Sequence, residues 1–219
     1  MTRFLLGTAC AFALAYGADD RVKVDNDVVR ILKVIDPPGS KTALHRHEMN
    51  RVMIYLNEGD QTITYDDGHV DRNHWKESQV VWSPGGPMHV SQNVGTAPLG
   101  IVEIELKQGP PGTAPQRDPS LDPVAIDGTH NILLFENPQV RVFRSWREAG
   151  ATEMMHEHTG RGRVVVLLTD IDAKVKAGDG KSSEMQGKAG DVYWTGGAIK
   201  HAGTNAGSKK FDMILVEVK

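Results

Sequence analysis

Short apolar runs, separated by turn residues, dominate the pattern along most of the chain. The runs VVRILKV, RVMIYL, QTITY, QVVW and LGIVEIEL lie between residues 28 and 106 and are rich in β-branched and aromatic side chains. Turn sequences such as NEGD, DDG and SPGG separate them, and no helical apolar stripe follows the first 17 residues. The pattern therefore predicts an all-β fold built from short strands.

The second half of the chain repeats this plan in register. The stretch DNDVVRILKVIDPPGSKTALHRH (25–47) aligns with ENPQVRVFRSWREAGATEMMHEH (136–158) at an offset of 111 residues. One insertion near Gly162 raises the offset to 112, and the register then holds as far as Glu105 and Glu217. Because chance does not preserve a register over such a distance, we predict a tandem duplication with a β-sandwich or closed barrel in each half.

A proline-rich stretch separates the two halves. Residues 108–123 hold five of the eleven prolines and have no apolar periodicity, which is typical of a semi-extended linker. The predicted units are therefore a first barrel at 18–107, the linker, and a second barrel at 124–219. Such a linker either wraps one half or only separates the two.

The start of the chain has the features of a signal peptide. Arg3 precedes an apolar run at residues 4–16, and small residues at Ala15 and Gly17 fit cleavage before Ala18. We expect a signal peptide at residues 1–17, a secreted or periplasmic protein, and no membrane span in the mature chain. The alternative is an ordinary buried N-terminal helix.

Composition excludes several classes of function. The net charge is −3 and the sequence has no block of Lys and Arg, so we expect no nucleic-acid partner. Cys10 is the only cysteine and lies in the predicted signal peptide. The mature protein then has no disulfide, no thiol nucleophile and no cysteine-based zinc site.

Histidines supply the strongest chemical signal. Six of the nine fall at matched positions in the two halves, and these are His45, His47 and His89 with His156, His158 and His201. In a strand, residues two apart face the same side, so each H-x-H pair directs two imidazoles into one space that a third histidine can complete. Three imidazoles suit a transition metal and leave coordination positions open. The alternatives are polar residues in a barrel mouth, or an inherited second copy that is idle.

These motifs resemble those of the cupin superfamily. GSKTALHRH and GATEMMHEH are similar to the first cupin motif, in which a glycine precedes H-x-H by five residues. SPGGPMHVSQN resembles the second motif, whereas TGGAIKHAGTN matches it more loosely because Gly196 replaces the proline. The resemblance covers almost all of the chain after residue 17 and implies a bicupin, with two tandem jelly-roll β-barrels. Locally, HRHEMNRVMIYLNEGDQTI is also similar to small cupins associated with β-alanine degradation.

One position departs from the cupin pattern. The family places a glutamate shortly after H-x-H, but this chain has Arg51 or Val52 there, and Gly162 or Arg163 in the second half. An inward arginine about 6 Å from a divalent ion would be repelled by ~5 kcal/mol at an effective dielectric of about 20. We therefore expect the apolar faces that begin at Val52 and at Val164 to line the barrels and both arginines to point outward. The alternative is an inward arginine that binds an anion.

The resemblance implies a metal-dependent function. It implies a divalent transition metal (Fe, Mn, Zn, Ni or Cu) held by three neutral histidines, whose uncompensated charge favours anionic or enolate-forming ligands. Cupins with three-His sites include dioxygenases, so an oxygenase-type enzyme for a small organic acid or diketone-like substrate is expected. The alternatives are a non-catalytic module that binds a sugar or organic anion, and a structural or storage protein.

Further expectations concern the pocket and the partners. The substrate-pocket candidates are Trp82, Trp194, Arg51 and Arg163. A small molecule is the expected partner, and a homo-oligomer is compatible with the fold class. Glu103 and Glu105 share one face of a strand, which we interpret as a solvated face. The first half is favoured as the working site because SPGGPMH keeps the proline and glycine of the second motif.

The predicted export has a direct test. If residues 1–17 are removed during export, the first residue of protein recovered from the periplasm or the medium is near Ala18. N-terminal sequencing of that protein checks the expectation. Recovery of the protein from the cytosol with Met1 intact would contradict it.

Overall fold

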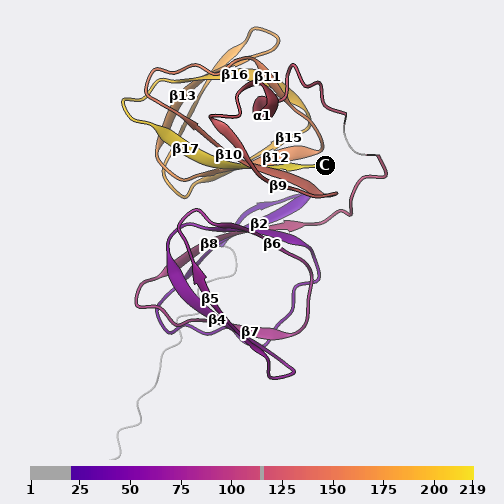
Figure 1. Cartoon of the computed structure of the whole chain (residues 1–219), viewed down its shortest axis with the longest axis vertical. Helices are drawn as coiled ribbons and strands as arrows, with labels where there is room; N and C mark the ends of the chain where they lie inside the picture. The colour runs from indigo at the N-terminus through magenta and orange to yellow at the C-terminus, as the bar shows by residue number, and fades with distance from the viewer. Residues whose placement is uncertain (1–20, 114–115) are drawn as a thin grey trace, which may run out of the picture.

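The computed structural model describes residues 21–113 and 116–219, so the predicted signal peptide lies outside the described residues (Figure 1). Nearly all regular structure in the described part is β-strand, as the sequence predicts. The first half contains β1 (Val22–Asp25), β2 (Val29–Asp36), β3 (Arg51–Tyr55), β4 (Gly59–Tyr65), β5 (Val70–Trp75), β6 (Val80–Ser83), β7 (His89–Asn93) and β8 (Leu99–Leu106).

The second half repeats this series after one short helix. The elements are α1 (Pro123–Ile126), β9 (Asn131–Glu136), β10 (Val140–Arg147), β11 (His156–His158), β12 (Gly162–Leu167), β13 (Ile171–Ala177), β14 (Ser182–Gly187), β15 (Val192–Gly196), β16 (Ile199–Asn205) and β17 (Phe211–Val218). Within residues 21–113 and 116–219, no helix is long and apolar enough to cross a membrane.

Each half is a barrel-like pair of antiparallel sheets. In the first half, a five-stranded sheet of order β1-β2-β8-β3-β6 faces the sheet β5-β4-β7. In the second half, the order β15-β12-β17-β10-β9 faces the sheet β11-β16-β13-β14. Figure 1 shows the two units one above the other along the long axis of the molecule. The prediction of two tandem β-barrels is therefore confirmed.

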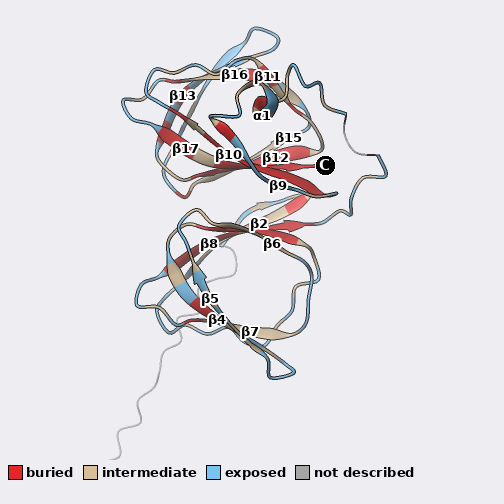
Figure 2. Cartoon of the chain, in the orientation of Figure 1, coloured by how far each residue is buried: buried red, intermediate tan, exposed pale blue. Residues whose placement is uncertain are grey.

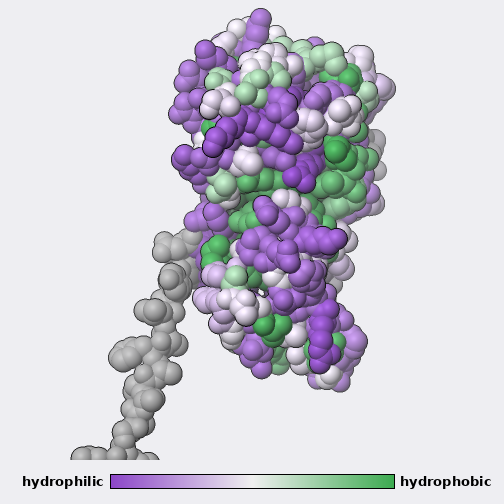
Figure 3. Space-filling model, turned by 60° about the vertical axis from the view of Figure 1, so that its left-hand side comes forward, coloured by the Kyte–Doolittle hydropathy of each residue, from purple (hydrophilic) through white to green (hydrophobic). Residues whose placement is uncertain are grey.

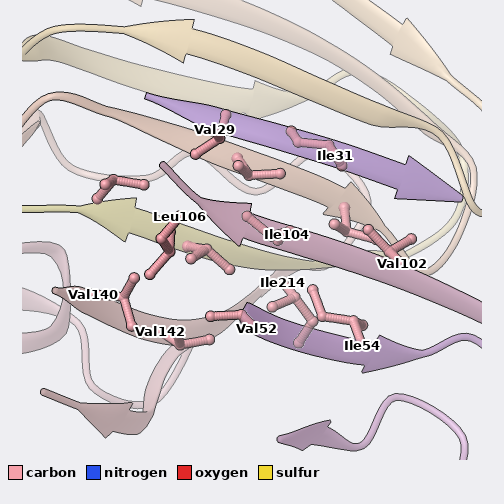
Figure 4. Close-up of a cluster of buried hydrophobic side chains, with 14 residues drawn as sticks. Val29, Ile31, Val52, Ile54, Val102, Ile104, Leu106, Val140, Val142 and Ile214 are labelled. Atoms are coloured by element: carbon pink, nitrogen blue, oxygen red, sulfur yellow. The ribbon is translucent and has the colours of Figure 1, made fainter. Parts of the chain in front are cut away.

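The two five-stranded sheets pack against each other through a shared hydrophobic core. Fourteen buried residues form this cluster (Figure 4), and they are Val29, Ile31, Val52, Ile54, Val102, Ile104, Leu106, Val140, Val142, Val164, Val166, Ile214, Val216 and Val218. Figure 2 shows buried residues concentrated where the barrels meet, and Figure 3 shows apolar surface around the same waist. Since a fully buried aliphatic side chain contributes about 1.5–3 kcal/mol, this interface is a major source of stability.

This interface corrects the expected direction of β3. Val52 and Ile54 belong to the shared core instead of lining the first barrel. Because neighbours in a strand face opposite sides, Arg51, Met53 and Tyr55 point into the barrel. Met53 and Tyr55 indeed join a separate small cluster with Leu99, Ile101 and neighbouring side chains.

In the second barrel the side chains of β12 alternate in the same way, and the expected outward direction of Arg163 is likewise wrong. Val164 and Val166 of β12 face the first barrel, so Arg163 lies on the inner side with Val165 and Leu167. The inner cluster here is larger than in the first barrel, with Phe143, Val165, Leu167, Ile171, Ala173, Phe211 and Leu215. The second barrel is therefore the more completely filled of the two.

The later part of the predicted linker packs onto the second barrel. The backbone N–H of Glu157 donates to the carbonyl oxygen of Leu121 at 2.8 Å. Asp122 caps α1 and accepts a hydrogen bond from Arg141 at 2.9 Å, while Arg117 donates to Glu136 at 2.9 Å. Residues 117–123 thus cover the second barrel rather than only separating the two halves.

The shared core leads to a stability prediction. Ile104→Ala removes a fully buried side chain between the barrels and should lower the free energy of unfolding by about 2–5 kcal/mol. The matched control is Ile132→Ala, at a site that is 46% exposed, with an expected change of about 0.5 kcal/mol. Chemical denaturation followed by fluorescence measures both. Similar losses for the two variants would contradict a shared core.

Candidate metal centre

The first histidine triad is assembled by one backbone pairing. His45 forms an isolated bridge with His89, the first residue of β7, with N–H···O distances of 3.0 and 2.7 Å in the two directions. The Nε2 atoms of His45 and His47 are 3.1 Å apart, and the rings of His45 and His89 are 4.6 Å apart between centroids. Candidate ligand atoms from all three histidines lie within 4.8 Å of one another. The structure therefore brings the three predicted residues together.

The second triad has the same geometry in a more enclosed setting. His156 and His158 lie on β11, and His156 pairs with His201 of β16. The Nε2 atoms of His156 and His158 are 3.0 Å apart. All three of these histidines are buried, whereas all three of the first triad are only half-buried.

Hydrogen bonds at the far side of the rings orient the free nitrogens. Nδ1 of His45 lies 2.8 Å from the carbonyl oxygen of Ala43, and Nδ1 of His89 lies 3.0 Å from that of Pro87. A carbonyl oxygen can only accept, so Nδ1 carries the proton in each neutral ring and Nε2 keeps its lone pair. His156 has the same arrangement with the carbonyl oxygen of Met154 at 2.9 Å.

This orientation fits a bound cation. The Nε2 atoms of each H-x-H pair lie 3.0–3.1 Å apart, and where neither nitrogen carries a proton their lone pairs repel unless a positive ion lies between them. Imidazole nitrogens about 2.1 Å from one ion and at right angles to each other would lie about 3 Å apart. The donor set of three imidazoles suits first-row divalent transition metals. The residues of both triads therefore fit the metal that the sequence predicts.

Two carboxylates lie behind the histidines, which corrects the interpretation of Glu105 as part of a solvated face. Glu217 is buried, and its Oε1 accepts a hydrogen bond from Nδ1 of His158 at 2.7 Å. Glu105 is also buried, and its Oε1 lies 3.7 Å from Nδ1 of His47. Such carboxylates fix the tautomer and the direction of a ligating histidine. Their matched positions in the duplication were the sequence signal for this role.

Arg51 lies inside the first barrel, in contrast to the expected outward direction. Its side chain is 8% exposed and donates to Glu103 at 2.9 Å and to Ser83 at 3.0 Å. Burial lowers the pKa of His89, and the positive charge of Arg51 acts in the same direction. Glu103 balances the guanidinium charge, which allows an arginine to lie near a metal site.

Arg163 is buried in the second barrel. Burial lowers its pKa to about 10, and its Nε and Nη1 atoms have no hydrogen-bond partner. Burial also lowers the pKa of His201 to about 3 and raises the pKa of Glu217 to about 7, the latter against the opposing effect of Arg141. This barrel thus encloses charged groups with little access to water.

The first triad opens into a cavity of about 680 Å³ inside the first barrel. Tyr55 and Trp75 stack there with ring centroids 4.1 Å apart, and Trp75 donates to Gln61 at 3.0 Å. Apolar walls come from side chains such as Met53 and Ile101. The volume is typical of a site for a small organic ligand.

The two candidate tryptophans lie mainly on the other side of the sheet. Trp82 and Trp194 pack against the shared core, and Trp82 meets Phe135 edge-to-face at 6.5 Å between centroids. Trp82 also contributes to the wall of the first cavity, and the ring of Trp194 lies against Gly162. Neither tryptophan takes part in a triad.

Sequence comparison finds little similarity to known proteins. No family model matches the chain. The uncharacterized protein MJ1618 of Methanocaldococcus jannaschii is 31% identical over 72 residues, which cover 33% of this chain and 55% of that protein. The match thus spans about half of the relative's length.

Solved structures share the architecture at low sequence identity. A cupin 2 conserved barrel domain protein from Leptotrichia buccalis has a TM-score of 0.54 at 16% identity and covers 90% of this chain and 86% of its own. A variant of oxalate decarboxylase from Bacillus subtilis has a TM-score of 0.60 at 13% identity, with coverage of 87% and 69%. A variant of salicylate 1,2-dioxygenase from Pseudoaminobacter salicylatoxidans has a TM-score of 0.57 at 12% identity, with coverage of 87% and 68%. These likenesses concern the fold.

The different burial of the triads predicts different pH dependences of metal binding. Each histidine must be neutral to bind a metal ion. A histidine with a lower pKa stays neutral, and so keeps its metal, down to a lower pH. Burial lowers the pKa of His201 to about 3, whereas the triad of His89 is only half-buried. The second triad should therefore retain metal at pH values at which the first has released it.

Two variants separate these titrations. His201→Ala leaves the first triad, and His89→Ala leaves the second. Equilibrium dialysis between about pH 7.5 and 4.5 should show that His201→Ala loses its metal at a higher pH than His89→Ala does, because only the second triad is fully buried. Loss at the same pH in both variants, or first in His89→Ala, would contradict the assignment.

Proposed function

We propose that this protein, a bicupin by fold, is a metal-dependent enzyme whose first histidine triad is the catalytic centre. The observation that carries the proposal is the contrast between the barrels. The first triad opens into a cavity of about 680 Å³, whereas the second triad is buried beside a lumen filled with apolar side chains. The first arrangement offers a substrate both space and access to the metal ligands.

The residues of the first barrel have separate roles in this proposal. His45, His47 and His89 would hold a divalent transition metal (Fe, Mn, Zn, Ni or Cu) through Nε2. When bound, such an ion supplies Lewis acidity or, for a redox-active metal, electron transfer. Glu105 orients His47 from behind, and the stacked pair of Tyr55 and Trp75 shields the apolar part of the cavity from water.

The charge of the site supports a small organic acid as substrate. Three neutral ligands leave the charge of a divalent ion uncompensated, which favours an anionic ligand. Arg51 also lies inside the barrel, where Glu103 balances its charge but its Nε has no hydrogen-bond partner and can donate to an anionic group. The names of two solved structures with the same fold state activity on oxalate and on salicylate, which are both organic acids. We propose an oxygenase-type reaction for this site.

The second triad supports a structural role. Its three histidines, Glu217 and Arg163 are buried, so an ion there would be enclosed by protein. Residues 117–123 add a further cover through contacts to Arg141 and Glu136. We further propose that the protein is exported, which the sequence of residues 1–17 supports.

A comparison of two variants tests the catalytic assignment. The protein is purified without an affinity tag, loaded with Fe²⁺ and supplied with a set of small organic acids while oxygen uptake is recorded. His89→Ala should abolish uptake, and His201→Ala should keep at least about half of it, because its first triad is complete. Uptake that depends on His201 alone would reverse the assignment. Metal binding without uptake for any acid would favour a non-catalytic binding module.

Arg51 provides a second prediction. Arg51→Gln removes a cation from the cavity wall but leaves the three histidines, so metal content should stay unchanged. The KM for an anionic substrate should rise about tenfold, as expected when one charge-assisted contact is lost. The control is Arg72→Gln, which removes an exposed arginine on β5. An unchanged KM in Arg51→Gln would exclude contact between this arginine and the substrate.

A further inference from the structure

A second hollow, distinct from the triad cavity, lies between the two barrels. It has a volume of about 1240 Å³ and is lined mainly by residues of the first barrel. Residues 190–193, which lead into β15 of the second barrel, form the opposite wall. We call this hollow the inter-barrel groove.

The inter-barrel groove shares part of its lining with the triad cavity. Six residues line both spaces, and these are Arg21, Val34, Asp36, Thr42, Ala43 and Ser91. Along the described residues, β1 pairs with β2 over Arg30–Leu32, and no described strand pairs with Val34–Asp36 on that side. The groove therefore lies directly beside the space in front of the triad, and a thin wall of shared residues is all that the two lining sets place between them.

The charge of the groove differs from that of the whole protein. Its lining contains four cationic side chains (Arg21, Lys23, Lys33 and Lys41) and two acidic ones (Asp36 and Asp191), in a chain with a net charge of −3. The Nζ of Lys33 donates to the carbonyl oxygen of Gly190 at 2.7 Å, which fixes this cation in the wall. A cleft lined mainly by charges of one sign attracts ions of the opposite sign.

We propose that the inter-barrel groove is an entrance through which an anionic substrate reaches the first triad, and that the cations of the groove attract that substrate. The inference rests on the proposed function and adds to it a route and a substrate charge. It also explains why an acidic protein carries a local excess of positive charge at this place.

Metal removal by two flat chelators tests whether the cations of the groove attract an anion. The His201→Ala protein keeps the first triad intact and lacks one histidine of the second. It is loaded with Co²⁺ and mixed with dianionic pyridine-2,6-dicarboxylate or with neutral 1,10-phenanthroline. Lys41→Glu should slow removal by the dianion about fivefold at about 10 mM ionic strength, where screening is weak, and hardly at about 0.5 M. Removal by phenanthroline should not change.

The matched control for charge is Lys181→Glu. Lys181 is exposed and pairs only locally with Asp179, yet its replacement changes the net charge by the same amount. This variant should alter neither rate by more than about 1.5-fold, since Lys181 does not line the groove and solvent screens an exposed charge. Equal slowing of removal by the dianion in Lys181→Glu and Lys41→Glu would show that only the net charge matters. It would contradict the proposed attraction of the substrate by the cations of the groove.

A bulky residue at the junction tests the route itself. Ala43 lines both spaces, so Ala43→Trp should slow removal by both chelators about tenfold or more, with the rates expressed per bound Co²⁺ because the carbonyl oxygen of this residue contacts His45. The control is Leu44→Trp at the next residue, which lines neither space and should leave both rates unchanged. Unchanged rates of metal removal in Ala43→Trp, or equal slowing in both variants, would contradict the proposal that the groove is the entrance.

Failure of the proposed function gives a different result. If the starting protein takes up no Co²⁺, the triad is not a metal site, and the proposed function and this inference both fall. If the metal binds but the rates of metal removal are the same in Lys41→Glu and Ala43→Trp as in the starting protein, only the proposed entrance is contradicted.

Discussion

The packing of two five-stranded sheets against each other is the constraint on which the rest of the structure depends. One face of β3, β8, β12 and β17 is committed to the shared core between the barrels. Because side chains alternate along a strand, every residue between those positions must face a barrel lumen. This is why Arg51, Glu105 and their counterparts lie inside the barrels. The shared core thus determines the polar surroundings of both triads.

Duplication gave the two barrels equivalent ligands but different interiors. Each triad directs Nε2 atoms at one another at 3.0–3.1 Å, and each has a glutamate behind one histidine. The second lumen is filled by a cluster that includes Phe143 and Phe211, while the first keeps a cavity. The same ligand set can therefore serve an enclosed ion in one barrel and an accessible one in the other.

The sequence could predict the features that depend on local pattern. Short runs of β-branched residues predicted the all-β fold, and the in-register duplication with two H-x-H pairs identified both triads. The direction of β3 could not be predicted, because both of its faces are apolar apart from Arg51. One face packs in the lumen and the other against the second barrel, so alternation alone does not distinguish them. The packing of residues 117–123 depends on long-range contacts to Arg141 and Glu136 that no local pattern reveals.

The central claim is that the first triad binds a transition metal in the wall of an open cavity. Anomalous X-ray diffraction from crystals of the tag-free protein, recorded on both sides of the absorption edge of the metal found by elemental analysis, tests it most directly. The account predicts a peak about 2.1 Å from Nε2 of His45, His47 and His89. Crystals without a peak at these nitrogens, from protein that regains less than about 0.1 equivalent of metal on titration, would contradict it.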